Sequence, residues 1–273
     1  MGIRLCVVGG GRMGTALVAG LLAGGWAQAG EIAVAERLAE GREALRARFP
    51  GLVVEAEPVA ADGALVAVKP YDAEGVCRRL AGLGYRQVLS IAAGITTASL
   101  EGWLGGDAAV VRAMPNTPAQ LGAGASVISG GKRATEADLA WAEGILAAVG
   151  TVVRLPEELI DAATGVSGCG PAYLYYLAEA LVAAGVTEGL DPGTTRVLVD
   201  QTLYGAARML LETGRTAEAL RAEVASPGGS TEAAIYVLEA RLVRGAVADA
   251  VAAAVLRAGE LGATPPGPPR KSS

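Results

Sequence analysis

Short apolar runs bounded by glycine alternate with longer alanine- and leucine-rich stretches from residue 3 to residue 155. The short runs have the length of buried strands, and the longer stretches have the spacing of helices. This alternation predicts βαβ units that share a mostly parallel sheet. Strands are expected at 3–8, 32–35, 52–54, 64–68, 88–91, 110–113, 126–128 and 152–155, and helices at 13–23, 38–48, 73–83 and 136–149.

The pattern changes after Pro156, and from Leu159 onward no run has the composition of a strand. Asp191 and Pro192 suit the start of a helix and Gly214 suits the position after its end, so a long helix is expected over 192–213. Its centre is apolar on more than one face, which predicts that another subunit covers it. We therefore expect an α/β domain at 1–158, an all-α domain at 159–264 and a proline-rich, disordered tail at 265–273.

The composition excludes several classes of protein. The 273 residues are 52% apolar and carry a net charge of −5 without a basic patch, which argues against nucleic-acid binding. The three cysteines are scattered and histidine is absent, so we expect no metal site and free thiols in a reducing compartment. No stretch approaches the ~20 apolar residues of a membrane span, and the N-terminal run is too short for a signal peptide. We predict a cytoplasmic protein with neither a membrane nor a nucleic-acid partner.

A glycine-rich loop directly follows the first predicted strand. Residues 9–14 read Gly-Gly-Gly-Arg-Met-Gly, the pattern G-x-G-x-x-G, and a helical stretch begins after them. In this pattern Gly9 allows a tight turn, Gly11 lets a pyrophosphate approach the backbone, and Gly14 lets helix and strand pack closely. The helix N-terminus then favours negative charge. The strand before and the helix after favour a dinucleotide site over a glycine-rich turn without a ligand. Its expected contacts are Gly9, Gly11, Arg12, Met13 and Gly14.

Glu36 and Arg37 follow the second predicted strand, where a dinucleotide site meets the adenine ribose. A carboxylate at this place accepts hydrogen bonds from the ribose diol and repels a 2′-phosphate, which favours NAD. An arginine can instead pair with the 2′-phosphate, which favours NADP. The two neighbours therefore argue in opposite directions, and a pair of solvated loop charges is the third interpretation.

Three further loops are expected at the same edge, because open α/β sheets bind ligands at the carboxyl ends of their strands. Lys69 precedes a proline that ends strand pairing, which favours a role at the cofactor edge over that of an ordinary surface lysine. Small residues end the fifth strand and leave room for a flat ring. Asn116 lies in a loop fixed by two prolines, where a polar contact and a purely structural turn are equally supported. The cofactor contacts expected here are Val68, Lys69, Pro70, Ala93, Gly94 and Asn116.

A hydroxyl-rich segment opens a helical stretch near the end of the chain. Residues 225–232 read Ala-Ser-Pro-Gly-Gly-Ser-Thr-Glu. Two glycines expose the backbone and three hydroxyls gather at a helix N-terminus, which suits a small anion and a carboxylate above all. An ordinary capped helix start is the alternative, but capping accounts for only one hydroxyl.

Taken together, these motifs resemble the pyrroline-5-carboxylate reductase family. The resemblance covers almost the whole chain, with Ser226–Gly229 and Thr231 similar to the family's signature segment. It is carried in order by residues 9–14, 68–70, 92–94, 114–118, 166–168, 171–173, 211–214 and 226–231.

The resemblance implies a doubly wound Rossmann domain and a helical dimerisation domain whose helices interlock with those of a second subunit, with dimers that often form decamers. It implies reduction of 1-pyrroline-5-carboxylate to L-proline, the last step of proline synthesis, with NADPH usually preferred to NADH. By position, Thr231 is implied to be catalytic and to bond the ring nitrogen. Because the family often has small hydroxyl residues in place of Glu36 and Arg37, the NADP preference stays open. The implied carboxylate contacts are Ser226, Gly228, Gly229, Ser230 and Thr231.

The absence of histidine fits this chemistry, because a cyclic imine can be protonated near neutral pH before hydride arrives, whereas alcohol dehydrogenases need an acid or base. The protein then has mainly to orient the ring against a nicotinamide near Ala93 and Gly94. A β-hydroxyacid dehydrogenase is an alternative that lacks its catalytic lysine, since none lies between Lys132 and Lys271. A non-catalytic NADP-sensing protein is another, but it would not need the Ser226 segment.

Overall fold

The computed structural model of the chain describes residues 2–263 and divides into two compact units. Within the described residues, one unit contains 2–169 together with 253–263, and the other is Gly170–Ala252. The domain boundary expected between residues 158 and 159 stays a prediction. The disordered tail expected at 265–273 lies outside the described residues.

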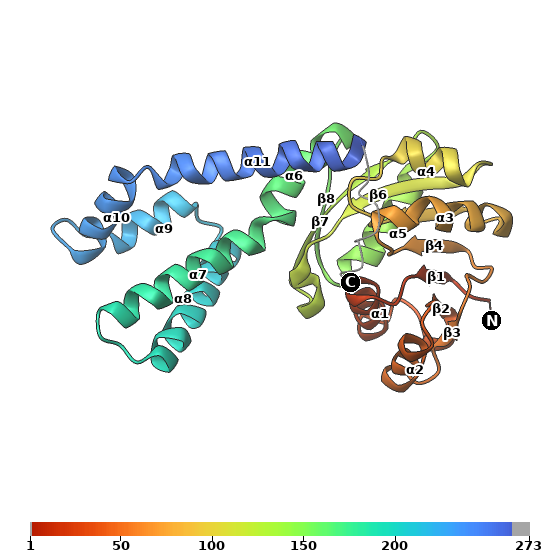
Figure 1. The fold of residues 1–273 in the computed structure, drawn as a ribbon, viewed down its shortest axis with the longest axis horizontal. Coiled ribbons are helices and arrows are strands. Elements are labelled where there is room, and N and C mark those ends of the chain that lie inside the picture. Colours follow the sequence, from red (N-terminus) through yellow and green to blue (C-terminus); the bar gives the residue numbers. More distant parts are fainter. Residues whose placement is uncertain (1, 264–273) are drawn as a thin grey trace, which may run out of the picture. The chain divides into compact units, whose positions relative to one another are not determined.

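The first unit is built on one eight-stranded sheet (Figure 1). From edge to edge the strand order is β3-β2-β1-β4-β5-β6-β7-β8. Neighbouring strands are parallel except β6 and β7, which pair antiparallel. The mostly parallel sheet and all eight predicted strands are confirmed. The strands are β1 Leu5–Val8, β2 Ile32–Ala35, β3 Val53–Glu55, β4 Gly63–Val66, β5 Gln87–Ser90, β6 Ala109–Met114, β7 Gly124–Gly130 and β8 Gly150–Arg154.

Five helices connect these strands, and the four predicted ones are confirmed. The fifth, α4, was missing from the prediction because its eight residues are too few to show a helical period. Its N-cap is Thr96, whose hydroxyl accepts a hydrogen bond from the N–H of Ser99. The helices are α1 Arg12–Ala23, α2 Ala39–Arg48, α3 Pro70–Leu80, α4 Thr97–Leu104 and α5 Glu136–Ala147.

Side chains of the central strands alternate between two buried clusters, one on each face of the sheet. Leu5 and Val7 of β1 pack with α1 and α5, whereas Cys6 and Val8 pack with α3 and α4. A second thiol, Cys77 of α3, lies in the same cluster as Cys6. Because both faces are covered, the strands are apolar at nearly every position, which is why they stand out in the sequence.

The chain reverses its direction of travel across the sheet between β1 and β4. Strands β2 and β3 lie on one side of β1, and β4 lies directly on its other side. The loops that leave the carboxyl ends of β1 and β4 therefore diverge, and a doubly wound sheet opens its ligand crevice at this switch point.

A buried ion-pair cluster fixes the segment that follows β8. Arg112 of β6 is only 7% exposed, and its guanidinium donates to Glu157 at 3.2 Å and to Asp161 at 3.3 Å. Glu157 opens a short 3-10 turn, Glu157–Leu159, and Asp161 lies in α6, Ile160–Ala163. Two carboxylates on one guanidinium leave this buried charge paired.

The second unit is helical, as predicted, and no strand occurs after Arg154 among residues 2–263. The long helix expected at 192–213 is α8, with Asp191 as N-cap accepting from the N–H of Thr194 and Gly214 at φ +65°. Its apolar side chains are exposed in the single chain: Val197 is 68% and Leu211 83% exposed. The helices beyond α6 are a π-helical turn Thr164–Gly168, α7 Gly170–Thr187, α8 Pro192–Glu212, α9 Ala217–Val224, α10 Ser230–Ala240 and α11 Val243–Ala263.

Within the described residues, none of the helices has both the length and the apolar character that a membrane crossing requires.

Candidate functional site

A pocket of about 850 Å³ lies at the switch point, where the loops after β1, β2, β4, β5 and β6 meet. Residues far apart in the sequence are thus brought together at the carboxyl ends of the strands. This is the place at which the sequence predicts a dinucleotide. Of the predicted cofactor contacts, the pocket is lined by Gly9, Gly11, Arg12, Met13, Glu36, Arg37, Val68, Lys69, Pro70 and Ala93.

The glycine loop has the geometry that its pattern predicts. Gly9 has φ +110°, and a Cβ there would lie 2.6 Å from the carbonyl oxygen of Ala67, which follows β4. A Cβ on Gly14 would lie 2.1 Å from the carbonyl oxygen of Gly9, so α1 can approach the strand only with glycine at this position. A Cβ on Gly11 would meet nothing within 4 Å, and Gly11 lines the pocket. Its backbone is therefore open to a ligand.

The start of α1 offers positive charge to that ligand. Its N-cap, Gly11, has no side-chain cap, and its first turn contains no acidic residue. The first N–H groups of such a helix lack intrahelical partners and point outward, which makes them suited to a phosphate. Arg12, the first residue of α1, adds a full charge beside them.

Three cationic side chains of the pocket, those of Arg12, Arg37 and Lys69, have no partner among residues 2–263. Arg79 is also at the pocket and pairs weakly with Glu57, with 3.7 Å between Nε and Oε2. The carboxylate of Glu36 accepts two main-chain N–H groups within the protein. The free charges are therefore mainly positive, which favours a ligand with several phosphate oxygens.

Three predicted cofactor contacts do not line the pocket. Gly14 acts through packing, and Gly94, at φ +76°, lies against α11, where its Cβ would be 3.1 Å from the N atom of Gly262. The Asn116 side chain donates to the carbonyl of Ser167 at 3.0 Å and accepts from the N–H of Ala125 at 2.9 Å. Both ends of this amide are used inside the protein, which supports the structural interpretation of its loop. Direct cofactor contacts of Gly94 and Asn116 stay predictions.

The pocket also contains residues that the sequence analysis did not single out. Asp72, Val76 and Arg79 come from α3, at spacings of four and three residues, so they share one face of that helix. This periodicity, beginning just after Lys69, is the signal that could have found them. Gln120 was harder to predict, because the 3-10 turn Thr117–Leu121 has no period of its own. Thr117 also lines the pocket, and it belongs to the loop 114–118, from which the sequence predicts polar contacts. The other lining residues are Val8, Ala35, Leu38, Ala56, Glu57, Pro58, Ala67, Ile91, Met114 and Pro115.

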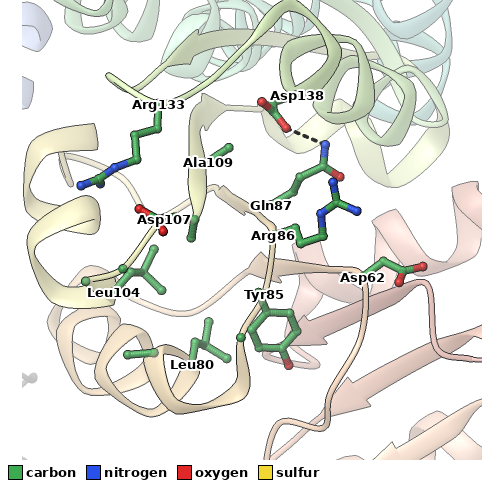
Figure 2. Close-up of a pocket in the computed structure, with 15 residues that line it drawn as sticks. Asp62, Leu80, Tyr85, Arg86, Gln87, Leu104, Asp107, Ala109, Arg133 and Asp138 are labelled. Carbon is green, nitrogen blue, oxygen red and sulfur yellow. Dashed lines mark hydrogen bonds between the residues drawn. The ribbon is translucent and has the colours of Figure 1, made fainter.

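A second pocket, of about 750 Å³, lies at the opposite ends of the strands, where β5 and β6 begin (Figure 2). Its central polar contact is internal: Gln87 donates to Asp138 at 2.7 Å. Burial would raise the pKa of Asp138, but hydrogen bonds from Thr135 and Gln87 outweigh it and hold this pKa below its usual value. Asp138 also closes the capping box of α5. These contacts stabilise the fold. The second pocket lies away from the carboxyl ends of the strands, where such sheets bind ligands.

The hydroxyl-rich segment of the helical unit forms the start of α10. The N-cap is Gly229, without a side-chain hydrogen bond, so none of the three hydroxyls caps the helix as the alternative interpretation required. The hydroxyls of Ser226, Ser230 and Thr231 have no partner among the described residues, and neither have the N–H groups of Ser230 and Thr231. Gly228 differs, because its N–H donates to the Glu232 carboxylate at 2.8 Å. The segment thus presents unpaired donors at a helix N-terminus.

Comparisons with known proteins match both the sheet-containing region and the helical region of the chain. The family model described as pyrroline-5-carboxylate reductase dimerisation matches residues 157–261, and the one described as NADP oxidoreductase coenzyme F420-dependent matches residues 4–94. A pyrroline-5-carboxylate reductase from Synechocystis is 40% identical over 266 residues, covering 96% of this chain and 99% of the relative.

Solved structures give the same result. A pyrroline-5-carboxylate reductase from Coxiella burnetii is 37% identical, with a TM-score of 0.90 over 95% of this chain and 98% of that one. Pyrroline carboxylate reductase from Plasmodium falciparum, solved with NADP bound, is 28% identical with a TM-score of 0.82 over the same shares. The relatives match over nearly the full length of both chains, and the two family models cover the regions that contain the glycine loop and the start of α10. The chain therefore belongs to the pyrroline-5-carboxylate reductase family.

Proposed function

We propose that this chain is a pyrroline-5-carboxylate reductase that transfers hydride from a nicotinamide dinucleotide to the C=N bond of 1-pyrroline-5-carboxylate and so forms L-proline. The observation that carries this proposal is the pocket at the switch point, where the glycine loop, the start of α1 and three unpaired cations face one cavity. Family membership specifies the substrate, because relatives of similar length share about 40% identity with the chain.

The cofactor that fits the pocket is NADPH, with NADH as the alternative. The open backbone at Gly11 and the free N–H groups of α1 suit the pyrophosphate, while Arg37 offers a partner for a 2′-phosphate. The Plasmodium falciparum relative was solved with NADP. When bound, the nicotinamide would supply the hydride. The contacts of the protein with it are expected from the loop after β5, which contains Ala93 and Gly94.

The start of α10 is the proposed binding segment for the substrate. Its helix N-terminus and the unpaired N–H groups of Ser230 and Thr231 suit the carboxylate, with Ser226 and Gly229 completing the loop. The Gly228 N–H is held by Glu232, so Gly228 contributes mainly its left-handed turn, at φ +72°. The Thr231 hydroxyl is proposed to bond the ring nitrogen and is the group we assign as catalytic.

The chemistry needs little from the protein beyond orientation. The ring nitrogen of a cyclic imine can be protonated in solution near neutral pH, so no imidazole is required, and the chain has none. A hydroxyl beside that nitrogen can hold its proton in place while the main-chain N–H groups fix the carboxylate.

The assembly proposed is a homodimer, with a decamer built from dimers as the larger alternative. Large apolar side chains of the helical unit are exposed in the single chain, among them Val197, Leu198 and Leu211. This region is matched by the family's dimerisation model. Sedimentation of the full chain would distinguish a dimer from a decamer. A cytoplasmic location stays a prediction.

Steady-state kinetics test the proposal. The purified full chain is mixed with 1-pyrroline-5-carboxylate and either NADPH or NADH, and oxidation of the nucleotide is followed by absorbance. We expect turnover with NADPH and proline as the product, and a 3-hydroxy acid with NADP should give none. Absence of turnover with either nucleotide, or turnover of the hydroxy acid alone, would contradict the assignment.

A further inference from the structure

The Glu36 side chain ties together two loops of the cofactor pocket. Its Oε2 accepts the N–H of Gly10 at 3.0 Å, and its Oε1 accepts the N–H of Leu38 at 2.8 Å. Gly10 lies in the loop after β1, and Leu38 is the N-cap of α2 after β2. We refer to these two hydrogen bonds as the Glu36 clamp. Both carboxylate oxygens are thus engaged by main-chain donors within the protein.

Two glycines leave room for this side chain. A Cβ on Gly10 would lie 3.1 Å from Oε2 of Glu36, and a Cβ on Gly41 would lie 2.8 Å from its Cγ. Neither glycine has a positive φ, so their backbones do not require glycine. At Gly41 the space given to the Glu36 side chain is therefore the reason that the structure offers for glycine. At Gly10 a Cβ would also lie 2.7 Å from Cδ1 of Leu45, so glycine there leaves room for both side chains.

The backbone at Glu36 and Arg37 is also held by a side chain of α2. The guanidinium of Arg42 in α2 donates to the carbonyl of Glu36 at 2.9 Å and to the carbonyl of Arg37 at 2.8 Å. The Arg37 side chain itself is exposed, lines the pocket and has no partner among residues 2–263. The turn is therefore fixed in a form that holds the carboxylate against the glycine loop and leaves the guanidinium of Arg37 to the ligand.

We propose that Glu36 is a positioning residue that clamps the glycine loop, and that it does not select between NADH and NADPH. An acidic residue after the second strand ordinarily accepts the ribose diol and repels a 2′-phosphate. Here two N–H dipoles hold the charge inside the loop, and Arg37 faces the pocket. Selection for the 2′-phosphate then belongs to Arg37. This inference rests on the proposed function, because it assumes a nicotinamide dinucleotide in the pocket.

Nucleotide binding without substrate tests the inference. Dissociation constants for NADPH and NADH are measured by fluorescence titration for the wild type, Glu36→Gln, Arg37→Gln and the control Glu40→Gln. Glu40 is an exposed carboxylate in the first turn of α2, the helix that begins after Leu38. An amide in place of Glu36 turns one acceptor into a donor that faces an N–H group.

For Glu36→Gln we expect both nucleotides to bind on the order of 10-fold more weakly, with their affinity ratio unchanged within about 2-fold. Arg37→Gln should weaken NADPH alone by about 10-fold or more. Glu40→Gln should behave as the wild type. Weaker binding of NADH together with unchanged or tighter binding of NADPH in Glu36→Gln would overturn the inference, and so would unchanged binding of both.

A second variant disturbs the clamp without removing its charge. Gly41→Ala places a methyl group against Cγ of Glu36, so we expect the same parallel loss of affinity although alanine favours a helix over glycine. Hydrogen exchange of the wild type supplies a readout that needs neither activity nor a variant: the N–H groups of Gly10 and Leu38 should exchange slowly in the free protein. Fast exchange at both would contradict the clamp.

The outcomes separate the two proposals. Because binding is measured without 1-pyrroline-5-carboxylate, an enzyme that fails to reduce that substrate still tests the clamp. Unequal losses in Glu36→Gln with normal turnover would overturn the clamp and leave the proposed function intact. A wild type that binds neither nucleotide would overturn the proposed function and this inference together.

Discussion

The carboxylate of Glu157 accepts two hydrogen bonds from Thr97, one from its N–H at 2.7 Å and one from its hydroxyl at 2.5 Å. Thr97 opens α4, and the same carboxylate pairs with the buried Arg112 of β6. Burial alone would raise the pKa of Glu157, but the hydrogen bonds from Thr97 and Arg112 outweigh it and hold this pKa below its usual value. One side chain thus joins a helix start, a central strand and the segment after β8.

This relationship makes stability depend on pH in a defined direction. Because the pKa of Glu157 is lowered on folding, its contribution is complete above the unfolded value of about 4.3 and is lost as pH falls through the folded pKa. Glu157→Gln should lower the free energy of unfolding by about 1–3 kcal/mol at pH 7, and by progressively less below about pH 4.

Denaturant unfolding of the wild type and Glu157→Gln from pH 7 to pH 3 measures this effect. The matched control is Glu158→Gln, since Glu158 is the exposed neighbour with no partner among the described residues. A deficit in Glu157→Gln that stays constant across this range would show that ionisation of Glu157 does not stabilise the fold.

Substitution of Gly14 should damage both stability and cofactor binding. In Gly14→Ala the new methyl group meets the carbonyl of Gly9 at 2.1 Å, and a backbone atom cannot move aside as a side chain can. We expect a loss of about 2–3 kcal/mol in unfolding free energy. Nucleotide affinity should fall by about 10-fold or more, because the loop and the start of α1 are pushed apart.

Thermal unfolding and nucleotide titration measure these losses. Gly102→Ala is the control, because Gly102 lies inside α4 and a Cβ there meets nothing within 4 Å. That variant should gain up to about 1 kcal/mol from the better helix propensity of alanine. Equal stability of the two variants would argue against close packing at Gly14.

The Thr231 hydroxyl is expected to act in the chemical step. Thr231→Ala should lower kcat/KM for 1-pyrroline-5-carboxylate by about 10- to 1000-fold, because one hydrogen bond to the reacting nitrogen is lost. Thr231→Ser keeps the hydroxyl and should retain most of the activity. Nucleotide affinity should stay at the wild-type level in both variants, and kinetics of Thr231→Ala equal to those of the wild type would refute the assigned role.

The exposed face of α8 is expected to be an interface between copies of the chain. Leu198 is 53% exposed in the single chain, and Leu198→Asp would bury a charge if another subunit covers it. We expect a lower sedimenting mass for this variant than for the wild type. Leu121→Asp is the control, because Leu121 is 90% exposed and lies in the first unit. A wild type that sediments as a monomer would contradict the proposed assembly.

The strands and the glycine loop could be predicted because their physical causes are local in the sequence. Strands covered on both faces are apolar throughout, and the loop needs glycine at fixed spacings. The roles of Asn116 and Glu36 could not be predicted in this way. The partners of Asn116 are main-chain atoms of Ser167 and Ala125. The clamp of Glu36 depends on Gly10, which lies in the loop after the neighbouring strand β1. Such pairings follow from the folded geometry and leave no periodic pattern.

The three cysteines differ in burial, so their reactivity can report unfolding of the first unit. Cys6 and Cys77 are buried in one cluster, and burial raises the pKa of Cys77 to about 11, so it carries almost no thiolate at neutral pH. Cys169 is only partly buried. An alkylating reagent should therefore modify Cys169 quickly, and Cys6 and Cys77 only as fast as the sheet separates from α3. The rate at which mass spectrometry detects modification of Cys6 and Cys77 then measures the rate of unfolding of the first unit.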